Sequence, residues 1–389
     1  MRRKFRSVGD NMPARNYKQW NKVPGKINSG EYVDSRIYSD KKIFEEEIEN
    51  IFSKVWIPVC HESELPKTNS FRTMTVAMQP IIVVRISDKE IKAYHNQSIN
   101  KPVGKLSTLT FPDEHEIRTE VKYGGFVWVT LNEEMDKTVE EWASGSFDCM
   151  QKSLDAEPLE VFHYHKAIIP CNYKLWHDTN SEFYHDYLHY HNRVTGFNDS
   201  YFARKNIGFD NGHINVGSFE VQYDQYEGSE SRDELSFPHL PANHWEMIDF
   251  FPGVNFNLRG SALRCDIMTP IAPDKVMIEF RGLGLKSDTP KERLIRQRHH
   301  NSIWGPFGRN LHEDLLAVST QQATMNEYAD ARRILHGRHE VDIDGDPTIH
   351  DEEGMRHFYD EWGQWMNRWP GNPDLTYEEG VNEGIRKAS

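Results

Sequence analysis

Residues 172–191 combine imidazole and carboxylate side chains at an unusual density, in the order NYKLWHDTNSEFYHDYLHYH. Packing alone does not explain such a stretch, because ionisable side chains are rarely buried without partners. If the stretch is helical, His185 and His189 project from the same face, one turn apart, and Glu182 lies one turn upstream. Two neutral imidazoles at that spacing can bind one metal ion. The sequence therefore predicts a metal site built on a helix.

A carboxylate from a second helix would complete this site. The segment Glu313–Gln322 follows a helical pattern and offers Asp314. Two histidines and one carboxylate on one face of a metal leave positions open for dioxygen, which is typical of mononuclear non-heme Fe(II). The plain alternative is that these are ordinary surface histidines, since the chain has 19. The ordered group of three ligands favours the iron site.

His191 is an alternative to His189 as the second histidine ligand. Positions 185 and 191 face different sides of a regular helix, so His191 would need a local break in the helix. This geometry favours His189.

Charge and composition exclude several classes of function. The chain has 389 residues and a net charge of −14, which argues against nucleic acid or an anionic membrane surface as partner. Its four cysteines form no CxxC pair, so neither a disulfide framework nor a zinc site is indicated. No apolar segment suits a signal peptide or a membrane span. A cytoplasmic location is expected.

The hydrophobic pattern divides the chain into three parts. Residues 1–38 are polar and interrupted by proline and glycine, as in an extended arm. Residues 39–157 begin with a helix and continue as a small antiparallel β domain. Residues 158–389 mix strands with helices and carry the metal ligands, so the fold class is α+β.

The individual elements follow from periodicity. Helices are expected near 41–56, 139–154, 173–190, 291–303, 311–328 and 351–368. Strands are expected near 71–78, 81–87, 90–96, 125–131, 161–170, 214–223, 253–257 and 275–284.

Several motifs, in order, resemble those of the Rieske non-heme iron oxygenases, the aromatic ring-hydroxylating α subunits. Asn172-Tyr-Lys followed by Glu182-Phe-Tyr-His185 and His189 is similar to the iron-binding motif of that family. The segments at 56–66, 80–85, 124–132, 305–322 and 351–362 resemble further parts of these proteins. The resemblance implies an N-terminal Rieske-like β domain and a C-terminal helix-grip catalytic domain of the START or Bet v1 type.

The chain departs from the family at the Rieske cluster. Family members bind [2Fe–2S] through Cys-x-His and Cys-x-x-His. Ser98 and Asn100 stand at the first pair here, and no cysteine occurs between Cys60 and Cys149. Cys60 lies in the entry segment of the domain, away from the ligand loops. We therefore expect one mononuclear Fe(II) site and no [2Fe–2S] cluster of the chain's own.

The resemblance also implies roles for two carboxylates and a set of partners. Glu182 occupies the place of the bridging aspartate that relays electrons to an iron-binding histidine, and Asp178 is expected to orient the ligands. Electrons from NAD(P)H would arrive through a reductase or ferredoxin and the cluster of a Rieske-bearing α-type subunit, in a trimer or hexamer. The expected substrates are O2 and an aromatic or similarly apolar molecule.

Two alternatives remain open at this point. The chain could be a non-catalytic structural or regulatory subunit, or an iron enzyme that takes electrons from its own substrate or a separate reductant. A complete set of His185, His189 and Asp314 argues against a pure scaffold, which has no need of iron ligands. Candidates for the lining of an apolar substrate pocket, for which a place in the plain core is the favoured alternative, are Phe251, Asn255, Phe256, Leu258 and Trp304.

Overall fold

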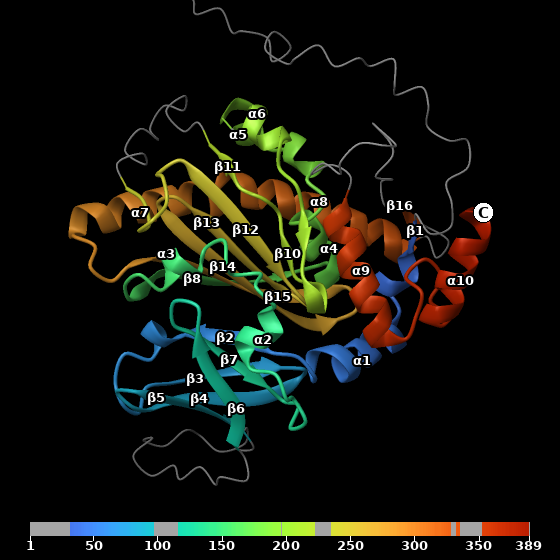
Figure 1. The fold of residues 1–389 in the computed structure, drawn as a ribbon, viewed down its shortest axis with the longest axis horizontal. Helices are drawn as coiled ribbons and strands as arrows, with labels where there is room; N and C mark the ends of the chain where they lie inside the picture. The colour runs from blue at the N-terminus through green and yellow to red at the C-terminus, as the bar shows by residue number, and fades with distance from the viewer. Residues whose placement is uncertain are drawn as a thin grey trace, which may run out of the picture.

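The computed structural model describes residues 32–96, 116–195, 197–221, 235–327, 332–334 and 352–388. A six-stranded antiparallel sheet lies against a larger antiparallel sheet, and helices flank the larger one (Figure 1). This arrangement confirms the α+β class. Two short strands, β1 (Tyr32–Asp34) and β16 (Arg332–Ile334), form a separate pair.

The small sheet contains the strands expected between residues 71 and 131. Its order is β2-β7-β6-β5-β4-β3. The bounds are β2 (Ile57–His61), β3 (Phe71–Val76), β4 (Gln79–Ser87), β5 (Glu90–His95), β6 (Glu116–Lys122) and β7 (Phe126–Thr130). The segment between β5 and β6 holds Ser98 and Asn100, which lie outside the described residues.

The expected helix at 41–56 is present in shorter form. Helix α1 (Lys41–Glu47) continues as the π-helical turn η4 (Ile48–Phe52). Asp40 caps α1, because its carboxylate accepts hydrogen bonds from the backbone N–H groups of Lys42 and Ile43. Before α1, the 3₁₀ turn η3 (Ser35–Tyr38) buries Tyr38, so the end of the expected arm packs into the core.

The large sheet has the order β8-β15-β14-β13-β12-β10-β9, and β11 pairs with β12. The long strands are β8 (Leu159–Ile169), β12 (His244–Phe250), β13 (Val254–Arg259), β14 (Ala262–Ala272) and β15 (Lys275–Leu285). The short strands are β9 (Ile207–Gly208), β10 (Ile214–Asn215) and β11 (Phe219–Glu220). Strands β12 and β14 were not expected from the sequence.

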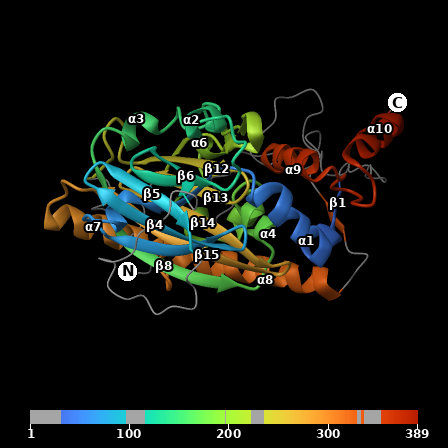
Figure 2. The same ribbon diagram turned by 90° about the horizontal axis from the view of Figure 1, so that it is seen from below.

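Two faces of the large sheet have different neighbours. One face receives α4 (Tyr173–Thr179), α7 (Pro290–Trp304) and α8 (Arg309–Glu327), and α8 packs against both α4 and α7. The other face packs on the small sheet, as the view from below also shows (Figure 2). In that contact Phe126 meets Phe256 with ring centroids 5.0 Å apart, and Trp128 meets Phe250 at 5.1 Å.

The remaining helices lie around this core. They are α2 (Val139–Ala143), α3 (Gln151–Leu154), α5 (Tyr190–Thr195), α6 (Asp199–Phe202), α9 (Glu353–Met366) and α10 (Tyr377–Ala388). The prediction of one continuous helix at 139–154 is wrong. Ser144 and Gly145 adopt left-handed backbone angles (φ 52° and 84°) that end α2. In the part of the chain that the structure describes, no helix is long and apolar enough to cross a membrane.

Candidate metal centre

The helix expected over residues 173–190 is interrupted, and the interruption shapes the site. Helix α4 ends at Thr179, and Phe183 has a positive φ of 57°, which a regular helix does not allow. The Glu182 carboxylate accepts hydrogen bonds from the backbone N–H groups of Tyr184 and His185. These bonds stabilise a turn that leads into the 3₁₀ segment η8 (His185–Tyr187). A local side-chain cap has therefore replaced the helix that periodicity predicted.

The turn brings His185 and His189 together with Asp314 from α8. The two imidazole centroids are 5.1 Å apart. Nε2 of His185 lies 3.4 Å from Asp314 Oδ1, and Nε2 of His189 lies 3.0 Å from the same oxygen. One ligand atom from each of the three residues lies within 4.8 Å of the others, which is suitable for one metal ion. The side chain of His191, the alternative ligand, is outside the described part.

Burial and unused hydrogen-bonding capacity fit a metal at this point. Asp314 is 3 % exposed and His189 2 %. Asp314 Oδ1 is buried and has no hydrogen-bond partner within the described residues, although both Nε2 atoms are close. A buried carboxylate oxygen without a partner is costly, and a cation bound by all three side chains would remove that cost. Two histidines and a carboxylate match the facial ligand set of non-heme Fe(II).

Each histidine also contacts a carboxylate through its other ring nitrogen. Nδ1 of His185 is hydrogen-bonded to Glu182 Oε1, and Nδ1 of His189 to Glu313 Oε2 at 2.6 Å. With Nδ1 donating its proton, the Nε2 lone pair of each ring is directed towards the metal position. Glu182 had been anticipated beside a ligand, whereas Glu313 had no assigned role. Its only signal in the sequence is its position next to Asp314.

The carboxylates also control protonation of the metal-free histidines. Burial lowers the pKa of His185, but Glu182 and Asp314 outweigh this effect and raise the pKa from 6.5 to about 10. Burial likewise opposes charge on His189, and Asp314 again raises its pKa. A metal ion must therefore displace a proton to bind here.

Asp178 lies in a different hydrogen-bonded group from the one expected. Its carboxylate accepts hydrogen bonds from the hydroxyls of Tyr38 (3.2 Å) and Tyr359 (3.0 Å). Asp178 thus connects α4 to η3 and α9. It is not among the residues that line the cavity beside the metal ligands.

The asparagine and glutamine of the sequence motifs hold the two ligand-bearing helices together. Asn172 caps α4 by accepting a hydrogen bond from the N–H of Lys174, at 3.0 Å. Its own backbone N–H donates to Gln322 Oε1 at 2.7 Å. Gln322 lies on α8, two turns beyond Asp314, so this bond fixes the position of Asp314 relative to the histidines.

A cavity of about 50 Å³ opens beside the metal ligands. A single water needs roughly 10–15 Å³ by the same kind of measure, so the space suits a molecule of only a few heavy atoms. Apolar and aromatic side chains form much of the wall, together with three arginines. The wall includes Trp176, Phe183, Met247, Trp304, Arg204, Arg259 and Arg264.

Of the five side chains expected near a pocket, Trp304 lines this cavity. Phe256 instead packs against Phe126 of the small sheet, and Leu258 belongs to the same buried core. Asn255 reaches the site indirectly, because its Oδ1 accepts a hydrogen bond from Arg264. Phe251 packs on Phe358 of α9. Side chains alternate between the two faces of the sheet along β13, so Phe256 and Leu258 face away from the side that Asn255 faces.

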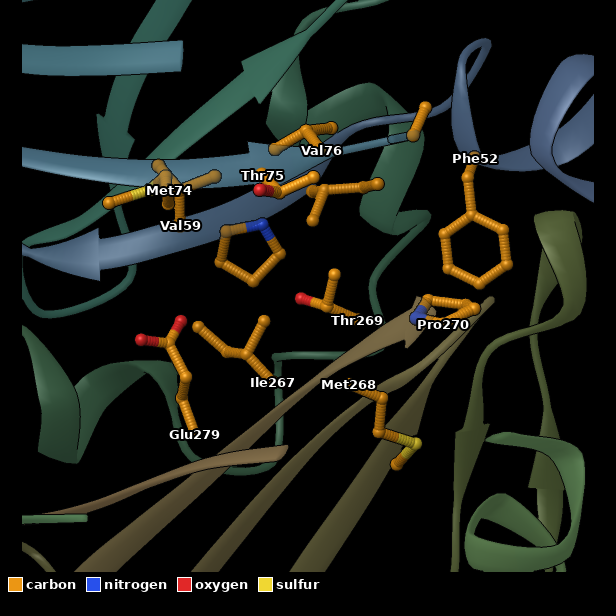
Figure 3. A pocket seen from close by; sticks show the side chains of 13 residues that line it. Phe52, Val59, Met74, Thr75, Val76, Ile267, Met268, Thr269, Pro270 and Glu279 are labelled. Atoms are coloured by element: carbon orange, nitrogen blue, oxygen red, sulfur yellow. The ribbon is translucent and has the colours of Figure 1, made fainter. Parts of the chain in front are cut away.

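The side chains of Cys60 and His61 are held in place by packing and hydrogen bonds within the protein. Cys60 is fully buried, and His61 is hydrogen-bonded to the carbonyl of Gly124 at 2.6 Å and to Ser63. Across the described ranges, the His185, His189 and Asp314 group is the one cluster suited to a metal. A second, smaller cavity of about 20 Å³ lies between the sheets, where Val59 and Met74 face Ile267 and Thr269 (Figure 3). None of the metal ligands lines it.

Comparison with known proteins agrees with this geometry. The family model described as "Ring hydroxylating alpha subunit (catalytic domain)" matches residues 155–368, which include all three candidate ligands. The chain belongs to the ring-hydroxylating oxygenase α-subunit family. Its members include monooxygenases and dioxygenases, so this α subunit is an oxidoreductase component.

Two relatives are similar over most of their length. The chain is 56 % identical to the methanesulfonate monooxygenase hydroxylase subunit alpha of Methylosulfonomonas methylovora, over 94 % of this chain and 98 % of the relative. It is 34 % identical to the 2-aminobenzenesulfonate 2,3-dioxygenase subunit alpha of Alcaligenes sp, over 89 % and 96 %. The first alignment spans 413 residues, so part of that relative has no counterpart in this chain of 389.

Solved structures support the fold. A naphthalene 1,2-dioxygenase superposes with a TM-score of 0.68 at 15 % identity, over 95 % of this chain and 98 % of that one. A quaternary ammonium Rieske monooxygenase superposes with a TM-score of 0.65 at 16 % identity, over 86 % and 95 %. At such low identity the likeness extends to the fold alone.

Proposed function

We propose that this α subunit uses one mononuclear Fe(II) to hydroxylate a small organic sulfonate. The observation that carries the proposal is the buried group of His185, His189 and Asp314, with a carboxylate on the far nitrogen of each histidine. The substrate class comes from the two relatives, each of which is named for an organic sulfonate. A cavity of about 50 Å³ favours a one- or two-carbon sulfonate over the aromatic substrate first expected.

The chain's own residues prepare the site for this chemistry. When bound, Fe(II) would supply the redox-active centre and the open coordination positions that dioxygen activation requires. His185 and His189 would hold it through Nε2, while Glu182 and Glu313 keep Nδ1 protonated. In the net reaction a C–H bond is replaced by C–OH, the second oxygen atom becomes water, and two electrons and two protons are consumed.

The electrons would come from another subunit. The sequence lacks cysteine between Cys60 and Cys149, and Ser98 and Asn100 stand where a first cluster-binding pair is expected. We therefore infer that a Rieske-bearing α-type subunit, supplied by NAD(P)H through a reductase or ferredoxin, feeds this iron across an interface of a trimer or hexamer. Glu182, which contacts His185, is the side chain proposed to form the bridge through which they reach the iron ligand.

Iron and sulfide analysis together with turnover tests this function. The purified chain is expected to bind about one iron and no acid-labile sulfide, and to hydroxylate methanesulfonate only when reductase and a cluster-bearing α subunit are added. NADH-dependent turnover by the chain alone with the reductase would refute the electron route. Absence of bound iron after reconstitution would refute the proposal that this chain is an iron enzyme.

The second candidate is a non-catalytic structural or regulatory subunit of a hetero-oligomeric oxygenase. The missing cluster ligands in the sequence favour it, since such a chain cannot supply its own electrons. An intact oligomer whose activity survives replacement of Asp314 by alanine in this chain would support that role. Loss of substrate oxidation in the same oligomer would support the oxygenase.

A further inference from the structure

Arg264 is a buried cation whose hydrogen-bonding capacity is incompletely used. It lies on β14, is 2 % exposed and lines the cavity that also contains His185, His189 and Asp314. Its Nε and Nη1 atoms have no hydrogen-bond partner among the described residues. A guanidinium carries five N–H donors and stays charged, so buried unpartnered donors indicate a missing acceptor.

The contacts that Arg264 does make hold it in place. Nη2 donates to Asn255 Oδ1 at 3.1 Å and lies 2.9 Å from Asp266 Oδ2. The guanidinium carbon lies 3.4 Å from the ring centroid of Trp304, on α7. These neighbours fix one side and one face of the planar group, and they leave Nε and Nη1 available to a molecule in the cavity.

The charge of Arg264 is weakly balanced within the protein. Asp266 is fully buried, and burial raises its pKa from 3.8 to about 7 despite the nearby arginine. A carboxyl group with a pKa of about 7 is only partly ionised near neutral pH, so it neutralises a neighbouring cation incompletely. An anion in the cavity would therefore meet a desolvated positive charge.

Arg204 is the other fully buried arginine of the cavity, and its positive charge is stabilised in a different way. Its guanidinium lies within 4.9 Å of the ring centroids of four aromatic side chains, which are Phe183, Tyr201, Phe219 and Trp245. Its Nη2 is also 4.0 Å from Asp186 Oδ2. Its Nη1 and Nη2 have no hydrogen-bond partner among the described residues either, but the aromatic faces on several sides stabilise this cation.

We propose that Arg264, supported by Trp304 and Asn255, binds the anionic sulfonate group of the substrate and so directs the hydrocarbon end towards the metal. This assignment rests on the proposed function, because it places a sulfonate in the same cavity. A sulfonate offers three acceptor oxygens with one charge, which suits the N–H groups of the two unpartnered nitrogens, Nε and Nη1. Small size is compatible with the cavity, since methanesulfonate has only one carbon.

The test measures binding of two probes of matched shape to the full iron-loaded chain. Methanesulfonate carries the charge, whereas methanesulfonamide is neutral and keeps the tetrahedral sulfur. Dissociation constants are measured by calorimetry and by Trp fluorescence for the unaltered chain and for Arg264→Gln. We expect methanesulfonate to bind about 10- to 100-fold more weakly to Arg264→Gln, with little change for methanesulfonamide. Arg264→Lys should restore part of the preference for the anion.

The third arginine of the same cavity, Arg259, provides the control. Arg259 is partly buried, and its Nε already donates to Asn257 Oδ1 at 3.2 Å. Arg259→Gln removes the same net charge, so it separates a direct contact from a general electrostatic effect. Methanesulfonate affinity should fall less in this variant than in Arg264→Gln, because the Nε of Arg259 is already occupied by Asn257.

Several results would overturn the assignment. The assignment is wrong if the unaltered chain does not bind methanesulfonate, if Arg264→Gln binds methanesulfonate equally well, or if Arg264→Gln loses affinity for both probes to the same extent. A loss of anion preference in Arg204→Gln but not in Arg264→Gln would place the contact elsewhere. Iron content, measured on every sample, distinguishes these outcomes from failure of the proposed function, which would show as a chain that cannot hold iron.

Discussion

At the scale of single residues, the metal ligands depend on carboxylates that do not touch the metal position. Glu182 and Glu313 approach the two histidines from different segments, yet each contacts Nδ1. Such partners fix the orientation of the ring and, once a metal has displaced the proton from the metal-facing nitrogen, hold the remaining proton on Nδ1. Glu313 is the clearer test, because Glu182 also stabilises the turn before His185.

Replacement of Glu313 by glutamine should weaken iron binding without preventing folding. The amide can still contact Nδ1 but does not carry the charge that fixes the histidine, so we expect about 10- to 100-fold lower iron affinity. Iron retained per chain after dialysis against a graded chelator measures this. Glu327→Gln, at the exposed end of the same helix, is the control and should retain iron normally. Equal retention by both variants would show that Glu313 has no such role.

His213 should make the fold sensitive to acid. Nδ1 accepts a hydrogen bond from the N–H of Phe251 (3.1 Å), Nε2 donates to the carbonyl of Trp142 (3.0 Å), and the ring stacks on Phe250. A second ring proton would oppose the Phe251 N–H. Burial accordingly lowers the pKa of His213 from 6.5 to about 3.

The sign of the effect follows from proton uptake. Below pH 6.5 the unfolded chain protonates this histidine and the folded chain does not, so stability falls as pH drops from 6.5 towards 3. The contribution approaches ~1.4 kcal/mol per pH unit. Urea unfolding of His213→Gln between about pH 8 and 5 should show a shallower pH dependence, although the variant is less stable at neutral pH. Exposed His239→Gln should behave like the unaltered chain.

Sequence reasoning grouped His185, His189 and Asp314 because their chemistry and order are unusual, and the structure brings these three candidate ligands together. Sequence reasoning did not find Arg264, because an arginine in a strand ordinarily indicates an exposed position. Here β14 is buried on both faces, and Arg264 pairs in register with Asn257 on β13. Charged residues on a doubly buried strand remove the alternation that identifies strands, and for this reason β14 itself was missed.

At the scale of elements, α1, α4 and α9 meet at one buried ion pair. Lys174 of α4 and Glu47 of α1 are 0 % and 1 % exposed in their side chains, and Trp362 of α9 donates to the same Glu47 oxygen at 2.7 Å. A buried pair contributes little net stability compared with apolar residues, but one member alone is a buried unpaired charge. This junction holds the helix that precedes the iron-binding turn.

Removal of one partner should therefore be much worse than removal of both. Glu47→Leu is expected to lower the free energy of unfolding by about 3–5 kcal/mol, and Glu47→Leu with Lys174→Met should recover most of that loss. Chemical denaturation of the two variants measures the difference. Glu45→Leu, whose pair with Lys41 is exposed, should change stability little. Similar losses in the single and double variants would contradict the argument.

The break in the helix after Thr179 illustrates what periodicity cannot predict. The apolar pattern of residues 173–190 continues through the break, and the deciding contact is the Glu182 side chain on the backbone N–H groups of Tyr184 and His185. Such caps depend on one rotamer and not on a repeat. The structure nevertheless places His185 and His189 beside each other, with ring centroids 5.1 Å apart, although a 3₁₀ turn stands where the sequence predicted an α-helix.

At the scale of the whole molecule, Arg281 connects the catalytic sheet to the small sheet. Its side chain, on β15, is fully buried, and it binds Glu64 Oε2 (2.9 Å) and the carbonyl of Val59 (3.2 Å). Aromatic contacts between β7 and β13 add apolar area to the same interface. The small domain is thus anchored to the metal-bearing domain by a charged contact surrounded by apolar ones.

Arg281→Met should weaken this anchor, because the Glu64 carboxylate, 6 % exposed, then keeps Arg72 as its ion-pair partner but loses the bond to the large sheet. We expect a loss of about 1.5–3 kcal/mol, measured by thermal and urea unfolding, while the aromatic contacts preserve a single cooperative transition. Adding Glu64→Gln should restore part of the stability, because a neutral amide costs less to bury than a carboxylate that has lost one of its partners. Exposed Arg298→Met on α7 should have no comparable effect. Two separate transitions in Arg281→Met would instead show that the charged contact alone couples the domains, and iron content followed through each transition would identify the domain that unfolds first.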